Sequence, residues 1–199
     1  AKVILTASSQ ESADKAVAQL REKYPSSKIM GISPNLANYK EVEDAFVIAT
    51  AQFGCVDVLV NNAGIFSFCD ILSTPVERIE RVIYLHDITT TKTCRLYAAD
   101  MIGRGGGRIL NMSSYSIWMP YPGLSLYSAS KAYLKSFSIA FSKEVEEHGV
   151  TVTAICPAGI ATDLYGLSPR LQRFGLKTGI LLSPESCARR ALNGMFRGQ

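Results

Sequence analysis

Short apolar runs alternate with longer segments of helical periodicity along the whole chain. The apolar runs predict strands near residues 2–7, 28–32, 56–60, 107–112 and 150–156. The periodic segments predict helices near residues 10–23, 39–53, 75–101, 126–147 and 184–197. This alternation is typical of an α/β fold, in which helices cover both faces of a parallel sheet. Because the pattern contains neither an internal repeat nor a second domain, we predict one domain over residues 1–199.

Composition narrows the class of protein. The 199 residues are 47% hydrophobic and 19% charged, which is enough material for a substantial core. No stretch approaches the roughly 18 apolar residues of a membrane helix, and the apolar start at residues 1–5 is too short for a signal peptide. We therefore expect a cytoplasmic protein. The net charge of +4 comes without long basic blocks, which argues against nucleic acid as the main partner.

The cysteines are scattered and odd in number, with no Cys-x-x-Cys pair. They predict neither a disulfide framework nor a metal site, and we interpret them as small core residues: Cys55, Cys69, Cys94, Cys156 and Cys187.

Tyr127 and Lys131 are the residues that most directly indicate chemistry. Residues four apart share one face of a helix, so the Lys131 ammonium is expected near the Tyr127 phenol. A nearby cation lowers the pKa of a phenol from about 10 toward the range of proton exchange at neutral pH. Ser114 ends an apolar strand-like run and could hold the oxygen of a substrate. Together these residues indicate carbonyl–alcohol redox chemistry.

The spacing of this pair is weak evidence by itself, because Tyr24 and Lys28 have the same spacing. Pro25 would break a helix there, and Glu11 stands where Ser114 stands relative to Tyr127. The alternative for Tyr127 and Lys131 is a surface tyrosine and lysine on an ordinary amphipathic helix. The glycine-rich run at residues 103–107 follows a predicted helix, so we interpret it as a helix-to-strand connection and not as a phosphate-binding loop.

Four segments occur in an order that makes the interpretation specific. The apolar run 56–60 leads into Asn61-Asn62-Ala63-Gly64, and residues 107–114, 127–131 and 156–162 follow. Together they resemble the short-chain dehydrogenase/reductase family over essentially the whole chain. The resemblance implies a Rossmann-like, doubly wound parallel sheet, NADP or NAD as cofactor, and a homodimer or homotetramer formed through the helices near 75–101 and 126–147.

The segment near residues 2–7 resembles the second strand of that family. We therefore expect the chain to lack the family's first strand and glycine-rich cofactor turn, and also its last strand. In the family's strand order, 3-2-1-4-5-6, the first strand lies between the strands near 2–7 and 56–60. The facing edges of those two strands are then expected to be unpaired, unless another chain supplies the missing strand.

The resemblance also implies roles for single residues. Tyr127 would exchange a proton with the substrate oxygen while hydride passes to or from the nicotinamide. Lys131 would tune Tyr127 and bind the nicotinamide ribose, and Ser114 would stabilise the substrate oxygen. Ser113 is interpreted as a residue that ends the strand through local hydrogen bonds.

His86 occupies the position at which the family carries a catalytic asparagine. Because its ring can donate and accept hydrogen bonds, we hypothesise that His86 takes part in the proton relay. The alternative is a partly buried helix histidine without catalytic duty.

The remaining cofactor contacts implied by the resemblance are Ser8, Asn35, Leu36, Asn61, Ala63, Gly64, Pro157, Ile160 and Thr162. Asn35 stands in place of an aspartate, so a turn-forming role is equally open, and Ala158 stands in place of a glycine. The strand end at residues 6–9 has no Asp or Glu, the usual signature of NAD. We therefore expect NADP in preference to NAD, with Ser8 near its 2′-phosphate.

Residues 163–182 are strongly apolar and are expected to form a mobile lid. Such a lid favours a lipid, acyl or steroid-like ketone, as do Trp118, Met119 and Tyr121, although the lid residues could also pack between subunits. Two other classes stay open: a catalytically silent family member that binds a nucleotide or regulates, and a different α/β enzyme such as a nucleotide-dependent transferase. A different α/β enzyme would not explain why Ser114, Tyr127 and Lys131 occur in this arrangement.

Overall fold

The computed structural model describes residues 1–198 of the chain. Its strands are β1 (Lys2–Thr6), β2 (Lys28–Ile32), β3 (Val58–Asn61), β4 (Gly107–Met112) and β5 (Val150–Ile155). Its α-helices are α1 (Gln10–Lys23), α2 (Tyr39–Phe53), α3 (Val76–Ile83), α4 (Thr90–Gly103), α5 (Ser125–Val145), α6 (Pro169–Lys177) and α7 (Pro184–Phe196). Every predicted strand has a counterpart, and the parallel sheets covered by helices confirm the predicted α/β class.

Two compact units make up the chain, residues 1–56 and the residues from Asp57 onward. In the first unit, β1 and β2 pair in parallel, from Lys2 opposite Lys28 to Thr6 opposite Ile32. Helix α1 packs closely on β2 because residue 31 is glycine, where an added Cβ would lie 2.9 Å from Val17 Cγ2. The prediction of one domain over residues 1–199 stays a prediction.

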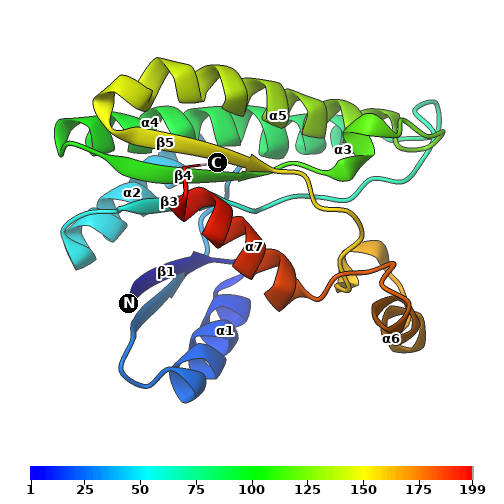
Figure 1. Cartoon of the computed structure of the whole chain (residues 1–199), viewed down its shortest axis with the longest axis horizontal. Helices are drawn as coiled ribbons and strands as arrows, with labels where there is room; N and C mark the ends of the chain where they lie inside the picture. Colours follow the sequence, from blue (N-terminus) through cyan, green and yellow to red (C-terminus); the bar gives the residue numbers. More distant parts are fainter. Residues whose placement is uncertain (199) are drawn as a thin grey trace. The chain divides into compact units, whose positions relative to one another are not determined.

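The second unit contains the parallel sheet β3-β4-β5, with β4 in the middle. Helices α4 and α5 cover one face of this sheet and α7 covers the other (Figure 1). Within residues 1–198 the strands form two separate sheets, β1-β2 and β3-β4-β5. In a parallel sheet all carboxyl ends meet at one edge, so the loops after β3, β4 and β5 come together there.

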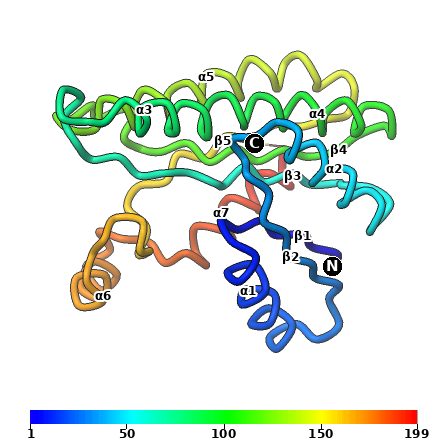
Figure 2. Tube along the Cα trace, turned by 180° about the vertical axis from the view of Figure 1, so that it is seen from behind, coloured from blue at the N-terminus to red at the C-terminus, as the bar shows by residue number. Residues whose placement is uncertain are grey.

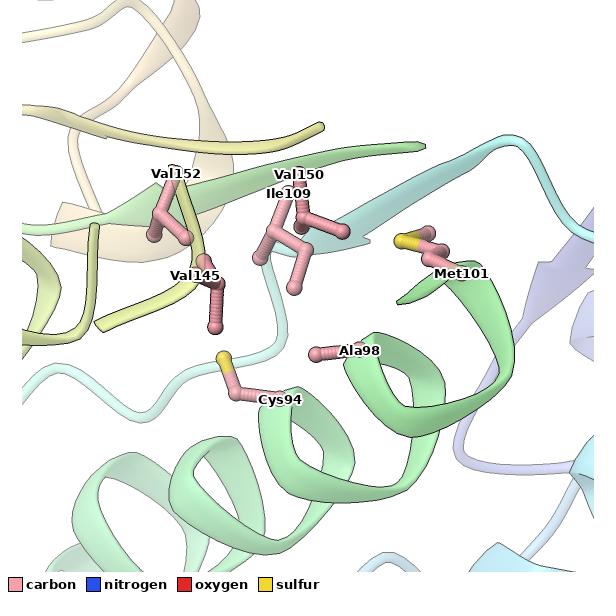
Figure 3. Packing of buried hydrophobic residues seen from close by; sticks show 7 residues of the cluster. All are labelled: Cys94, Ala98, Met101, Ile109, Val145, Val150 and Val152. Atoms are coloured by element: carbon pink, nitrogen blue, oxygen red, sulfur yellow. The ribbon is translucent and has the colours of Figure 1, made fainter. Parts of the chain in front are cut away.

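The core of the second unit lies between α4, α5 and the sheet. Buried side chains of α4 meet side chains of the strands and of the end of α5 (Figure 3): Cys94, Ala98, Met101, Ile109, Val145, Val150 and Val152. On the opposite face, Ala191 and Met195 of α7 pack against Leu110. Burial thus agrees with the interpretation of Cys94 and Cys187 as core residues, whereas Cys55, Cys69 and Cys156 are only half-buried.

The segment predicted as one helix over residues 75–101 contains a π-helical turn, η1 (Tyr84–Thr89), between α3 and α4. Figure 2 shows α3 and α4 following one another alongside α5. The prediction of a continuous α-helix was therefore wrong, because apolar periodicity does not report the extra residue that a π-turn inserts. His86 lies in this turn.

None of the helices within residues 1–198 combines the length and the apolar character needed to cross a membrane.

Candidate functional site

A pocket of about 380 Å³ opens at the carboxyl ends of β3, β4 and β5 in the second unit. Its walls come from the loops after these three strands and from α5. The lining residues are Asn62, Ala63, Gly64, Ile65, Phe66, Met112, Ser113, Ser114, Tyr127, Lys131, Pro157, Ile160, Thr162, Leu164 and Tyr165. The structure therefore brings Ser114, Tyr127 and Lys131 together in one cavity.

Ser114 and Tyr127 both line this pocket. Ser114 lies just beyond the end of β4, and its Oγ accepts a hydrogen bond of 3.2 Å from the Ser116 amide. Tyr127 is buried in the first part of α5, and the nearby Ser114 side chain lowers the pKa of its phenol. Both residues thus bring a hydroxyl group to the same pocket.

Lys131 lies behind this pair with only 4% of its surface exposed. Its Nζ donates a hydrogen bond of 2.9 Å to the Met112 carbonyl and lies 5.7 Å from the centre of the Tyr127 ring. Burial lowers the pKa of Lys131 to about 8, and the Asp87 carboxylate opposes that shift. The Ser113 hydroxyl donates to the Lys131 carbonyl at 2.6 Å, which ties α5 to the end of β4.

The direction of the Tyr127 pKa differs from the expectation. Burial raises the pKa of this phenol to about 12, Tyr165 adds to the rise, and only the Ser114 side chain lowers it. The predicted lowering by Lys131 was wrong for this structure, because the removal of the phenol from water sets the direction of the shift. At neutral pH Tyr127 is protonated, which is the form that donates a proton.

His86 is fully buried beside Tyr127, with the two ring centres 5.9 Å apart. Its Nε2 lies 2.9 Å from the Ile65 amide nitrogen, and its Nδ1 lies 2.8 Å from Ser130 Oγ. Burial lowers the pKa of His86 to about 3, and the Lys131 cation contributes to the shift. The imidazole is therefore neutral at physiological pH.

Ala63, Gly64, Pro157, Ile160 and Thr162, all expected to contact the cofactor, line the pocket. Asn61, expected with them, has its side chain bonded to Asn111 and Thr93 at 2.8 and 2.9 Å instead.

Ser8, Asn35 and Leu36 belong to the first unit. Ser8 is exposed just beyond the end of β1. Asn35 Oδ1 accepts the Ala37 amide at 3.1 Å, so its side chain forms the turn that was the alternative interpretation.

Aromatic side chains that the sequence did not single out for the site form one wall of the pocket. The Phe66 ring stands edge-on to Tyr127, at 5.1 Å between ring centres, and to Tyr165, at 4.9 Å. Sequence reasoning missed Phe66 and Ser130. The available signal for Phe66 was its place two residues after Gly64, in a loop at the carboxyl end of a strand.

The predicted lid, residues 163–182, contains α6, which the sequence analysis did not predict. Ser168 caps this helix, whose exposed side chains include Leu171 and Phe174. At the base of the lid Ile160 pairs with Leu182 in an isolated β-bridge, and the Leu182 amide donates to the Gly159 carbonyl at 2.9 Å.

Comparisons with known proteins agree with this geometry. The family model described as short chain dehydrogenase matches residues 1–169. The chain is 33% identical to a 3alpha-hydroxysteroid dehydrogenase of Mediterraneibacter gnavus over 85% of its own length and 68% of the relative's. It is also 33% identical to a 3-oxoacyl-[acyl-carrier-protein] reductase of Synechocystis sp. over 81% of its own length and 65% of the relative's.

Among solved structures, a short-chain dehydrogenase from Streptomyces avermitilis is similar with a TM-score of 0.74 and 30% identity, over 84% of this chain and 60% of that one. The chain thus spans about two thirds or less of the length of these relatives. The family model covers most of the chain, and the four sequence motifs surround one pocket at the carboxyl edge of the sheet. The chain belongs to the short-chain dehydrogenase family.

Proposed function

We propose that the chain carries the site of an NAD(P)-dependent oxidoreductase that transfers hydride between a nicotinamide and a carbonyl or alcohol substrate, with Tyr127 as acid and base. The observation that carries this proposal is that Ser114, Tyr127 and Lys131 line one pocket, with the Lys131 Nζ 5.7 Å from the centre of the Tyr127 ring. A positioned proton donor next to a second hydroxyl suits a substrate oxygen that changes its charge during the reaction.

The pocket suits a nicotinamide cofactor, which when bound supplies or accepts the hydride. At Gly64 the backbone borders the pocket, and an added Cβ would lie only 3.5 Å from Lys131 Nζ, so the glycine leaves room near this cation. Lys131 would bind the ribose of the nicotinamide. Pro157, Ile160 and Thr162 would hold its carboxamide and the phosphates, and Ala63 and Gly64 would contact the adenosine ribose. Ser8, Asn35, Leu36 and Asn61 are proposed for the adenosine end.

In the reducing direction the Tyr127 phenol gives its proton to the substrate oxygen, and the Ser114 hydroxyl donates a hydrogen bond to the same atom. The Lys131 cation stabilises the phenolate that remains, because two opposite charges attract strongly at a site with little water. In the oxidising direction the phenolate takes the proton back. The raised pKa of Tyr127 favours proton donation at neutral pH.

An apolar ketone is the substrate class that we propose. Phe66, Leu164 and Tyr165 give the pocket an apolar wall, and pockets of this kind recognise apolar ligands through area and shape. Two relatives carry names that refer to steroid and acyl substrates. We also propose NADP in preference to NAD, and a homodimer or homotetramer through α4 and α5.

We expect Tyr127→Phe to lower kcat for reduction of an apolar ketone by about 10²–10⁴-fold, because the variant has no proton to give. The measurement is oxidation of NADPH followed by absorbance, with NADPH affinity measured separately by fluorescence. Tyr24→Phe, at a tyrosine that is 48% exposed and has the same spacing to a lysine, serves as the control and should keep full activity. Equal activity of the two variants would contradict the proposal. Binding of NADPH without any turnover in the unmodified chain would identify a silent family member.

For cofactor choice we expect the protein to bind NADPH more tightly than NADH in a fluorescence titration. Ser8→Asp should weaken NADPH binding by about tenfold through repulsion of the 2′-phosphate and leave NADH binding unchanged or improved. Ser26→Asp, in the turn before β2, provides a control with the same change in charge. If Ser8→Asp leaves the ratio of the two affinities unchanged, Ser8 does not face the phosphate.

Phe66→Ala should lower kcat/KM for a bulky apolar ketone by at least about tenfold, because it removes an aromatic wall of the pocket. For a small ketone that does not reach this wall, the loss should be smaller. Steady-state kinetics with both substrates measures the difference. Phe68→Ala, at a phenylalanine that is 60% exposed, is the matched control. Equal losses for the two ketones would show that Phe66 acts on Tyr127 rather than on the substrate.

Lys131→Met should abolish activity without loss of stability. The folded-state pKa of Lys131, about 8, lies below its ordinary value of 10.5, so burying the protonated lysine costs stability at neutral pH. The variant avoids this cost, but the Met112 carbonyl loses its hydrogen-bond donor. We therefore expect a net gain in the free energy of unfolding of about 1–2 kcal/mol at neutral pH.

The pH dependence gives a second readout of the same variant. Between about pH 8 and 10.5 the unfolded chain binds more protons than the folded one, so Lys131 makes stability rise with pH. Urea denaturation at neutral and alkaline pH measures this rise, which Lys131→Met should lose. Lys143→Met, at an exposed lysine, should retain it. A large loss of stability at neutral pH in Lys131→Met would contradict the expectation.

A further inference from the structure

Three hydrogen bonds connect the loop after β3 to the backbone of Tyr127 through one buried ring. The Ile65 amide lies 2.9 Å from His86 Nε2, and His86 Nδ1 lies 2.8 Å from Ser130 Oγ. The Ser130 hydroxyl in turn donates to the Tyr127 carbonyl at 2.8 Å. Both side chains of this connection are buried, His86 fully and Ser130 with 3% of its surface exposed.

The donors and acceptors of this chain fix the tautomer of His86. The Ile65 amide can only donate, so Nε2 must be an unprotonated acceptor. The single Ser130 proton goes to the Tyr127 carbonyl, which can only accept, so Ser130 Oγ must accept from Nδ1. His86 is therefore neutral with its proton on Nδ1.

A protonated ring does not fit this arrangement. A second proton on Nε2 would point directly at the Ile65 N–H and remove the acceptor of that partly buried amide. The titratable groups around the ring are Lys131 and Tyr127 of α5 and Asp87 of its own turn, and the cation among them also opposes protonation. Proton transfer through His86 would require the hydrogen bond between Nε2 and the Ile65 amide to break.

We propose that His86 is a positioning residue, a neutral clamp that holds the Gly64–Ile65 loop against the start of α5 and so sets the place of Tyr127, and that it is not a member of the proton relay. The expected loss of activity in His86 variants rests on the proposed function. The hydrogen bonds that position His86 do not depend on it. Gly64 belongs to the same arrangement, since a Cβ at residue 64 would lie 3.0 Å from His86 Nε2.

The clamp is tested first without any reaction, by nuclear magnetic resonance on isotope-labelled histidine. The chain has two histidines, so exposed His148 provides the reference signal in the same spectrum, and His148→Gln assigns it. From about pH 5 to 8, with and without NADPH, we expect His86 to show one neutral form with a slowly exchanging proton on Nδ1. A proton on Nε2, or a charged ring in this range, would overturn the proposal.

Substitutions at residue 86 then separate positioning from proton transfer. Glutamine can place an acceptor near the position of Nε2, asparagine is too short to reach the Ile65 amide, and leucine offers neither bond. We expect kcat to fall by about tenfold to a hundredfold in His86→Leu, as for other misplaced catalytic groups. His86→Asn should lose nearly as much and His86→Gln clearly less, with the pH–rate profile of each variant parallel to that of the unmodified protein.

A relay predicts the opposite result. An amide takes up no proton at these pH values, so His86→Gln would lose as much activity as His86→Leu and its pH–rate profile would change shape. That result would overturn the clamp. Ser130→Ala removes the acceptor of the Nδ1 proton and should also lower kcat, whereas Ser128→Ala on the same helix should not. If Tyr127→Phe were fully active while the His86 spectrum matched the expectation, the proposed function would fail and the clamp geometry would stand.

Discussion

The site depends on the close approach of the loop after β3 to η1 and α5, and this approach is possible because residue 64 has no side chain. A Cβ there would press on the His86 ring and approach the Lys131 ammonium. The same region is joined by the bond from Ile65 to His86, by the bond from Lys131 to Met112 and by the bond from Ser113 to the Lys131 carbonyl. Segments far apart in the sequence are thus held within hydrogen-bonding distance around one cavity.

Burial shifts the pKa of the titratable groups at the site so that each neutral form is favoured. It raises the pKa of Tyr127 and Asp87 and lowers the pKa of Lys131 and His86. Charges that appear on buried groups interact strongly, because the surrounding protein screens them less than water does. Under the proposed function, this arrangement strengthens the effect of the Lys131 cation on the Tyr127 phenolate.

Sequence patterns predicted the strands and most helices to within a few residues, since hydrophobic periodicity reports which faces are buried. Helix spacing predicted that Tyr127 and Lys131 share a face, and the family resemblance predicted Ser114 beside them; the structure places all three at one pocket. The catalytic roles of these residues stay predictions.

Other features depend on tertiary packing and could not be predicted in this way. The π-turn around His86 changes the helix by a single residue, α6 lies in a segment noticed only for its apolar side chains, and the Tyr127 pKa is set by burial. The contact of His86 with the Ile65 amide joins residues 21 positions apart, and no local sequence pattern predicts it.

The bridge between Ile160 and Leu182 closes the lid segment into a loop whose two ends are fixed to each other. Residues inside such a loop can be replaced, inserted or rearranged while its two ends stay in place, because surface loops tolerate changes that do not disturb the backbone at their ends. Under the proposed function, the lid segment can therefore vary with the substrate while the strand ends that carry Ser114 and Pro157 stay unchanged.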